Sequence, residues 1–383
     1  MRACWLLAIG DHQPSTGLSI MPTSTEKQRQ FPCSRCGADL VFEPGQYALK
    51  CPYCQTENQI PQSQEVVQEE DFLSALRDLP SAQATQETLT VKCAGCGAES
   101  SLRPDVTADR CPFCGAAIVA SGTSAKIIKP KSLLPFHVKR EEAMGAFRRW
   151  VGSLWFAPSD LARFADANAV KGVYIPYWTY DCNTDSQYTG ERGEDYTETE
   201  HYSTFENGRM VTKTRTVRKT RWWPVSGRVR NSFDDILILA SNSLPRKYTE
   251  KLEPWDLENL EPYSDEYVAG FVAESYQIGL EGGFELARGV MEGPIRQSVH
   301  GDIGGDHQRI HSVRTRYMDI TFKHLLLPLW ISAYLYRGRT FRFLVNARTG
   351  QVSGERPYSG WKIAFLVVAL MSLVAAILLM VNR

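Results

Sequence analysis

Two matching cysteine quartets restrict the folds open to this chain of 383 residues. Each quartet has the spacing C-x2-C-x14-C-x2-C, and the second copy begins sixty residues after the first. The copies also share Gly-Ala after the second cysteine and proline after the third. The segment is therefore an internal repeat of one small fold, and its cysteines are Cys33, Cys36, Cys51, Cys54, Cys93, Cys96, Cys111 and Cys114.

This spacing predicts two structural zinc sites of the zinc-ribbon type. A C-x2-C turn offers two thiolates to one ion, and two such turns complete a tetrahedron with bonds of about 2.3 Å. Gly37, Gly97 and Gly115 follow the second cysteine of a turn, where a positive φ lets the backbone fold back, whereas Gln55 stands at the fourth such position. Four thiolates leave no open coordination position. We therefore expect two structural zinc ions that supply much of the folding free energy of the ribbons.

A disulfide framework and an iron centre are the alternatives to zinc. Disulfides at this density belong to short chains in oxidising compartments. The two remaining cysteines, Cys4 and Cys182, are far apart in the sequence, and this usage suits a reducing cytosol. An iron–sulfur or rubredoxin-type iron centre is the minor competitor.

Charge and motif content exclude several functions. Lys and Arg together number 43, and so do Asp and Glu, so no global basic charge attracts the chain to nucleic acid. Neither a G-x4-G-K-[ST] phosphate loop nor a G-x-S-x-G nucleophile motif occurs. The sequence therefore predicts neither an ATPase site nor a nucleophile elbow.

The length of the chain predicts several domains. The apolar run after Arg2 is too short for a clear signal peptide, so the first residues are a disordered extension, or they precede a true start at Met21. A short helix expected between the two quartets, near residues 72–79, either packs on a ribbon or docks a partner. The expected parts are the extension 1–30, a zinc ribbon 31–60, a linker 61–90 with a helix near 72–79, a zinc ribbon 91–120, an α+β domain 121–360 and a membrane anchor 361–383.

Periodicity in the large domain predicts an α+β fold with antiparallel strands. Apolar residues at helical spacing indicate helices over 141–154 and 281–299. Aromatic and β-branched residues indicate strands over 172–181 and 325–336. A turn at Arg348-Thr349-Gly350 separates two further strands.

A long β-hairpin is expected around Asn207-Gly208, a dipeptide typical of two-residue hairpin turns. With these residues in the turn, Glu206 faces Arg209, Tyr202 faces Lys213 and Glu200 faces Arg215. Opposite charges then lie across the strands, which accounts for the basic stretch 209–230 without a nucleic-acid partner. Unpaired basic residues near the base of the hairpin leave local nucleic-acid contact open.

A polar segment after the second helix holds candidate ligands for a metal or a hydrolytic site. The spacing of its two last histidines would place them on one helical face, whereas its glycines favour a flexible polar loop. No established metal signature matches the segment. The candidates are His300, Asp302, Asp306, His307 and His311.

The stretch 363–381 has no charged residue and, as a helix, is long enough for the hydrocarbon core of a bilayer, about 30 Å thick. Basic residues precede it at Arg348, Arg356 and Lys362, so we expect a tail anchor with the preceding chain in the cytosol. Ser372 and Ala376 form a small-xxx-small pair that leaves homodimerisation open.

The chain resembles an uncharacterised bacterial family of membrane-anchored double zinc-ribbon proteins. The CGA and CPFCG turns and the block TFKHLLLPLWISAYLYRGRTFRFLVNARTGQVSGERPYSGWK carry this resemblance, which extends over most of the chain from about Phe31. Members are often labelled as transcription factor IIB type zinc ribbons or as homologues of primosomal protein N′, the replication factor Y helicase. The resemblance implies no catalytic residues, and the helicase nucleotide-binding motif is missing from this sequence.

These observations favour a non-enzymatic scaffold or adaptor at the cytoplasmic face of the inner membrane, with protein partners. The first alternative is a nucleic-acid-binding zinc-ribbon protein at the membrane, associated with replication or transcription. The second alternative is a metal-assisted hydrolase that uses the segment from His300 to His311.

Overall fold

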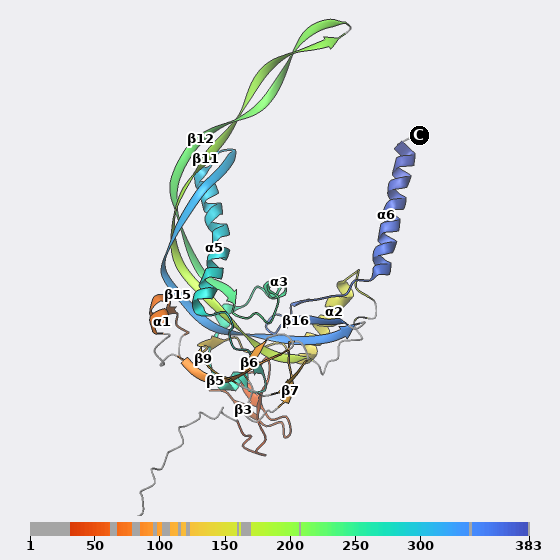
Figure 1. The fold of residues 1–383 in the computed structure, drawn as a ribbon. Coiled ribbons are helices and arrows are strands. Elements are labelled where there is room, and N and C mark those ends of the chain that lie inside the picture. The colour runs from red at the N-terminus through yellow and green to blue at the C-terminus, as the bar shows by residue number, and fades with distance from the viewer. Residues whose placement is uncertain are drawn as a thin grey trace, which may run out of the picture.

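The computed structural model describes residues 31–61, 67–78, 85–94, 98–101, 108–113, 116–119, 123–158, 161, 170–206, 208–336 and 339–381. A base of short strands and loops carries two projections, a long curved stalk of β-strands and the single helix α6 (Gly360–Val381) (Figure 1). The predicted extension 1–30 lies outside the described residues.

Three long strands form the stalk. The strand β11 (Lys171–Glu206) is central and pairs antiparallel with β12 (Arg209–Leu239) on one side and β15 (His307–Tyr336) on the other. At about 3.3 Å per residue, the 36 residues of β11 span roughly 115 Å. The last pair of β11 and β15 is Gly193 with His307, so the stalk continues beyond Gly193 as a two-stranded hairpin.

The predicted hairpin register is confirmed. Glu206 pairs with Arg209, Tyr202 with Lys213 and Glu200 with Arg215. The Arg215 guanidinium lies 3.0 Å from the Glu200 carboxylate, so opposite charges do meet across the strands. In the turn, Gly208 has φ +75°, and Asn207 lies outside the described residues.

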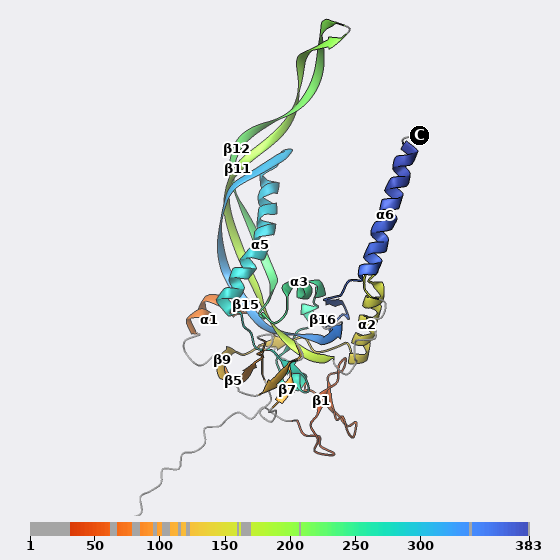
Figure 2. The same cartoon turned by 45° about the vertical axis from the view of Figure 1, so that its right-hand side comes forward.

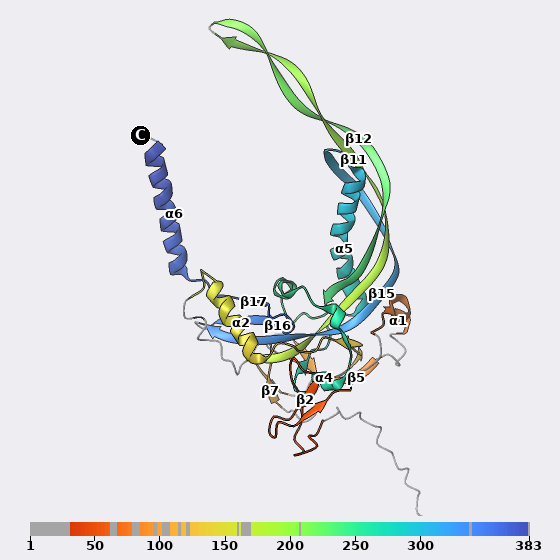
Figure 3. The same cartoon turned by 180° about the vertical axis from the view of Figure 1, so that it is seen from behind.

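Bulges at one level of the stalk accompany its curvature. The register of β11 with β12 shifts between Tyr180 and Cys182, and its register with β15 shifts between Asp181 and Asn183. Asp235 on β12 and Asp319 on β15 adopt positive φ near the same level. Bulges increase the twist and bending of strands, and the sheet curves between base and stalk in all three views (Figures 1, 2 and 3).

The two cysteine segments pack on opposite faces of the sheet in the base. Side chains alternate along β11, so Tyr174 points to one face while Val173 and Ile175 point to the other. Cys33 and Cys51 belong to the apolar cluster around Tyr174. The cluster around Val173 and Ile175 includes Cys93, Cys111 and Phe113.

Short elements complete the base and its connections. The first cysteine segment contains a three-stranded sheet of β1, β2 and β3, and β10 adds to β15 in parallel. The strands are β1 (Val41–Phe42), β2 (Ala48–Lys50), β3 (Glu57–Gln59), β4 (Glu70–Asp71), β5 (Thr85–Lys92), β6 (Glu99–Ser101), β7 (Ala108–Arg110), β8 (Ala117–Val119), β9 (Thr123–Ile128), β10 (Ser132–Leu133), β13 (Glu261–Pro262), β14 (Val272–Ala273), β16 (Arg339–Asn346) and β17 (Val352–Gly354). The small helices are α3 (Arg246–Thr249), η3 (Glu250–Leu252), η4 (Leu257–Asn259) and α4 (Asp265–Val268).

Both long helices predicted in the large domain are present. The helix α2 (Arg140–Ser153) buries Met144, Phe147 and Val151 on one face. The helix α5 (Leu280–Ile303) extends four residues beyond the predicted end at Val299 and lies along the stalk (Figure 1). The predicted turn before the last strand is also confirmed, since Gly350 there has φ +76°.

The linker helix packs on the stalk rather than on a ribbon. In α1 (Phe72–Asp78), Phe72 is buried, with its ring centroid 4.9 Å from that of Phe284 on α5 and 6.2 Å from that of Tyr180 on β11. The preceding β4 pairs with β15. A helix of this length is too short to be stable alone, so it depends on tertiary contacts. The ring contacts of Phe72 place it on the stalk.

Candidate metal centre

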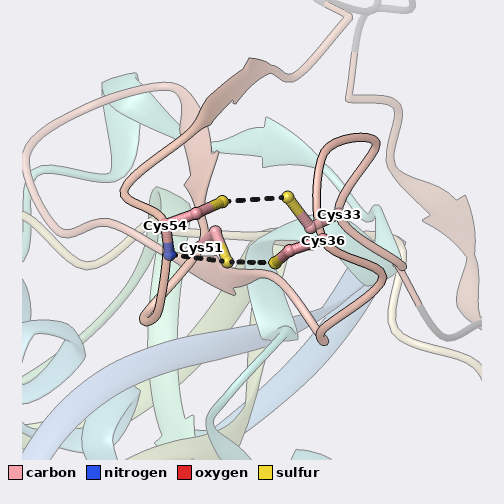
Figure 4. A group of neighbouring side chains, drawn as sticks. All are labelled: Cys33, Cys36, Cys51 and Cys54. Carbon is pink, nitrogen blue, oxygen red and sulfur yellow. Dashed lines mark hydrogen bonds between the residues drawn. The ribbon is translucent and has the colours of Figure 1, made fainter.

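The four cysteines of the first quartet converge on one point (Figure 4). The sulfur atoms of Cys33 and Cys54 are 3.5 Å apart, as are those of Cys36 and Cys51, and all four lie within 4.8 Å of one another. A tetrahedron with metal–sulfur bonds of about 2.3 Å has edges of about 3.8 Å. This arrangement could therefore hold one metal ion without a large rearrangement.

Tight turns position these sulfurs. The Cys33 N–H donates to the Ala38 carbonyl at 2.7 Å, and the Cys51 N–H donates to the Thr56 carbonyl at 2.9 Å. Gly37 has φ +72°, as predicted for the residue after the second cysteine. Gln55 has φ +60°, so the backbone adopts the left-handed conformation even where the sequence provides no glycine.

Hydrogen bonds shift the pKa values of two of these thiols in opposite directions. The Thr56 hydroxyl and backbone N–H lower the pKa of Cys54 to about 6. The Ala38 N–H lowers the pKa of Cys36, but hydrogen bonds with the thiols of Cys51 and Cys54 outweigh this effect and raise it to about 12. A metal must displace the remaining thiol protons, so its binding should weaken as the pH falls.

The second quartet repeats the backbone geometry in the residues that are described. The Cys93 N–H donates to the Ala98 carbonyl at 2.8 Å, and the Cys111 N–H donates to the Ala116 carbonyl at 2.8 Å. These bonds match those of Cys33 and Cys51 in the first copy. Cys93 and Cys111 are both buried, whereas the other two predicted ligands, Cys96 and Cys114, lie outside the described residues together with Gly97 and Gly115.

The copies differ in how they attach to the sheet. After the third cysteine and its proline, the first copy has Tyr53, which is 81% exposed, and the second has Phe113, which is fully buried. The aromatic residue at this position therefore anchors the second copy only.

The polar segment from His300 to His311 is not the flexible loop that its glycines suggest. His300 and Asp302 lie in the last turn of α5, whereas His307 and His311 lie on β15, so the two last histidines share no helical face. His307 Nε2 lies 3.0 Å from Asp195. Among the described residues, the five candidates form no group that could hold a metal ion. The residues from His307 onward form a strand because they pair with β11, although the nearby glycines favour a loop.

A second group of possible oxygen ligands was not predicted. Glu69, Asp181 and Asp234 meet beside the bulges, where Lys323 pairs with Glu69 at 3.1 Å. Burial and the hydrogen bond with Glu69 raise the pKa of Asp181 to about 7, and the same hydrogen bond lowers that of Glu69 to about 2. These residues come from distant parts of the chain, so no local pattern could have indicated the group. Through the ion pair of Glu69 with Lys323, this acidic group connects the segment before β4 to the stalk.

Comparisons with known proteins do not indicate an activity for this chain. The chain is similar to the uncharacterized protein YdjG of Bacillus subtilis (strain 168), with 26% identity over 345 residues that cover 87% of this chain and 92% of that protein. No family model matches the chain. No solved structure matches it either.

Proposed function

We propose that this protein is a non-enzymatic scaffold, anchored in the inner membrane by α6 and stabilised by two zinc ribbons, which presents the stalk to protein partners at the cytoplasmic face. The exposure of α6 carries the proposal. The most apolar 18-residue window of its segment Gly360–Met380 has a mean hydropathy of 3.0, and no part of that window is buried against the protein. A helix apolar all round needs an apolar environment, which a bilayer provides.

The stalk supports a role in binding. Its strands extend far beyond the core of the base, and the two-stranded part beyond Gly193 exposes Phe205 and Met210, which pair across the strands near the tip. An isolated two-stranded hairpin contributes little to stability in water. Its length is therefore better explained by contacts with other molecules than by the stability of this chain.

The cytoplasmic orientation rests on charge and redox chemistry. Arg348, Arg356 and Lys362 precede the uncharged run 363–381 of α6, and basic residues favour the cytoplasmic side of a span. A reducing cytosol also keeps the cysteine thiolates available for zinc. Asn382 and Arg383, the residues expected beyond the membrane, lie outside the described residues.

Nucleic-acid binding by the hairpin has less support. Much of its basic charge is compensated, since Lys219 lies 2.8 Å from both Glu198 and Glu200 and Arg218 lies 2.7 Å from Asp195. A nucleic-acid-binding protein should retain DNA or RNA at low salt and lose it steeply as salt increases. Retention of this kind by the purified chain would favour the alternative.

Cell fractionation tests the anchor. The full chain should sediment with membranes, resist alkaline carbonate extraction and dissolve in detergent, whereas a chain ending at Ser359 should be soluble. A matched variant with Leu370→Arg and Val374→Arg keeps the length of α6 but should also leave the membrane, because charges near the bilayer centre are costly. Carbonate-resistant membrane binding of both variants would contradict anchoring by α6.

Photo-crosslinking tests the scaffold role. A photoreactive residue in place of Met210 near the hairpin tip should yield a discrete adduct with a protein in intact cells. The same residue in place of Tyr53 on the first ribbon is a control for general exposure. If Met210 and other positions along the stalk gave no protein adduct beyond those obtained at Tyr53, the scaffold role would be wrong even though the anchor had been verified.

A further inference from the structure

Four arginines gather on the face of the stalk opposite α5. In the register of the sheet, Asp185 of β11 lies between Arg230 and Arg316, and Gln187 lies between Arg228 and Arg314. Directly opposite residues in a sheet point to the same face, so the four arginines surround Asp185. We call Arg228, Arg230, Arg314 and Arg316 the arginine quartet.

The other face of the same strands is covered by α5. Asn231, the neighbour of Arg230, donates to Ser298 of α5 at 2.7 Å, and Tyr188 donates to Asp302 of α5 at 2.6 Å. Neighbouring residues on a strand point to opposite faces. The arginine quartet therefore lies on the face that α5 leaves uncovered.

The charge of the quartet is only partly compensated. Asp185 is 5% exposed, forms an ion pair with Arg228 and lies 3.9 Å from Arg230. In the described part of the chain, neither Arg314 nor Arg316 has a carboxylate within ion-pairing distance, and both are exposed. Four guanidinium groups around one carboxylate leave an excess of three positive charges. Neutralising Asp185 does not require four arginines, and their mutual repulsion opposes folding.

Three of the four arginines, Arg228, Arg314 and Arg316, also line a hollow in the surface. The hollow has a volume of about 260 Å³ and is lined by Asp185, Gln187, Arg228, Arg314, Thr315 and Arg316. From strand geometry, the quartet's backbone positions form a rectangle of about 10 Å by 7 Å. Guanidinium groups bind phosphate oxygens through paired N–H donors, and Gln187 adds a neutral polar group.

Uncharged residues flank the arginine quartet along the strands and limit the length of a ligand that it could bind. On one side Asn183 is flanked by Ser232 and Met318, and on the other Thr189 is flanked by two serines, Ser226 and Ser312. A long polyanion such as nucleic acid would need basic residues to continue along the strand, and these rows contain none. The patch fits a compact anion.

We propose that the arginine quartet binds a compact ligand with two or more linked phosphate groups. Two rows of arginines, about 7 Å apart, match a ligand with more than one phosphate better than a single phosphate ion. This site is independent of the zinc ribbons and of the membrane anchor, so it stands or falls separately from the proposed function.

Calorimetric titration of the full chain in neutral detergent with inorganic pyrophosphate tests the site. Pyrophosphate should bind, and Arg314→Gln with Arg316→Gln should weaken binding at least tenfold. The control, Arg288→Gln with Arg296→Gln, removes the same charge from exposed positions on α5 and should change the affinity less than twofold. Circular dichroism should show both variants folded. Equal weakening in both double variants, or absence of pyrophosphate binding by the unmodified chain, would overturn the proposal.

Two further comparisons define the ligand. Sulfate should bind at least tenfold more weakly than pyrophosphate, and equal affinities would show a general anion effect and reject the proposal. The same titration in nanodiscs of phosphatidylcholine, with and without phosphatidylinositol bisphosphate, separates the sources of phosphate. If the lipid headgroup occupies the site, it should compete with pyrophosphate and weaken its binding. The lipid should have no such effect on the variant with Arg314→Gln and Arg316→Gln, and this pair of results would identify a headgroup ligand. Unchanged binding would identify a free phosphate compound.

Discussion

Buried ionisable residues make the stability of the base depend on pH, and Glu274 is the clearest case. This residue is 3% exposed and accepts a hydrogen bond from Ser243. Burial raises its pKa to about 7, although hydrogen bonds with Ser243 and Ser241 oppose the shift. The folded state therefore binds a proton that the unfolded state releases at about pH 4.5.

Glu274→Gln should stabilise the protein more at pH 8 than at pH 5. The pKa of Glu274 is higher in the folded state, so the stability of the unmodified chain falls as the pH rises from about 4.5 to 7, whereas glutamine does not titrate. The advantage of the variant should grow by up to about 3 kcal/mol over this range. Thermal unfolding in detergent at both pH values measures the effect. Glu258→Gln, at an exposed position, is the control, and a pH-independent difference for Glu274→Gln would contradict the prediction.

Single cysteine substitutions test the count of metal ions. If each quartet binds zinc independently, the intact chain holds two ions, Cys51→Ser holds one, and Cys51→Ser with Cys111→Ser holds none. Elemental analysis of protein purified without chelator provides the count. Cys182→Ser removes a buried thiol outside both quartets and should leave two ions. One ion or none in the intact chain would disprove the two-site proposal.

At the scale of elements, α5 is held against the stalk by close packing at Gly283. A Cβ atom there would lie 2.3 Å from the Tyr180 hydroxyl and 2.9 Å from Trp178, so only glycine fits without a shift. The same hydroxyl donates to the Leu280 carbonyl at 2.7 Å. Gly289, six residues later on the same helix, has no atom within 4 Å of the corresponding Cβ position.

The two glycines should respond oppositely to alanine. Gly289→Ala should raise the free energy of unfolding by about 0.5–1 kcal/mol, because alanine restricts the unfolded chain and favours the helix. Gly283→Ala gains the same propensity but should lower stability by about 1–3 kcal/mol, because it displaces Tyr180 and Trp178. Chemical denaturation of both variants measures the difference. Equal stabilisation by both substitutions would show that α5 does not pack closely at Gly283.

At the scale of the whole molecule, the directions of α6 and the hairpin limit how the protein can sit at a membrane. Both project from the same side of the base (Figures 1, 2 and 3). Charged residues such as Lys213 and Arg218 line the hairpin and cannot enter the hydrocarbon core without a large cost. If α6 spans a bilayer, the hairpin must therefore take a direction relative to α6 that keeps these charges outside the hydrocarbon core.

Protease protection should place the hairpin and the ribbons on one side of the membrane. An epitope inserted after Gly208 and a second one at the N-terminus should both survive protease added to intact spheroplasts, and both should be lost after lysis. A periplasmic epitope on a known membrane protein controls for protease access. Digestion of either epitope without lysis would refute the proposed topology.

Features that depend on neighbours along the chain could be predicted from the sequence. The cysteine spacing anticipates the convergence of the first quartet, Asn207-Gly208 anticipates the hairpin register, and the uncharged run after Lys362 anticipates α6. In each case a short stretch contains the chemistry that determines the structure, whether a pair of thiols, a dipeptide able to adopt positive φ or an apolar segment of sufficient length.

Only the tertiary structure decided how distant segments meet. Pairing of β11 with β15 converts the predicted loop around His307 into a strand, and packing against Tyr180 and Phe284 places α1 on the stalk. The arginine quartet likewise exists only because β12 and β15 flank Asp185. These contacts join residues more than forty positions apart, and their energies depend on register and on which face of a strand each side chain occupies. No local period in the sequence contains that information.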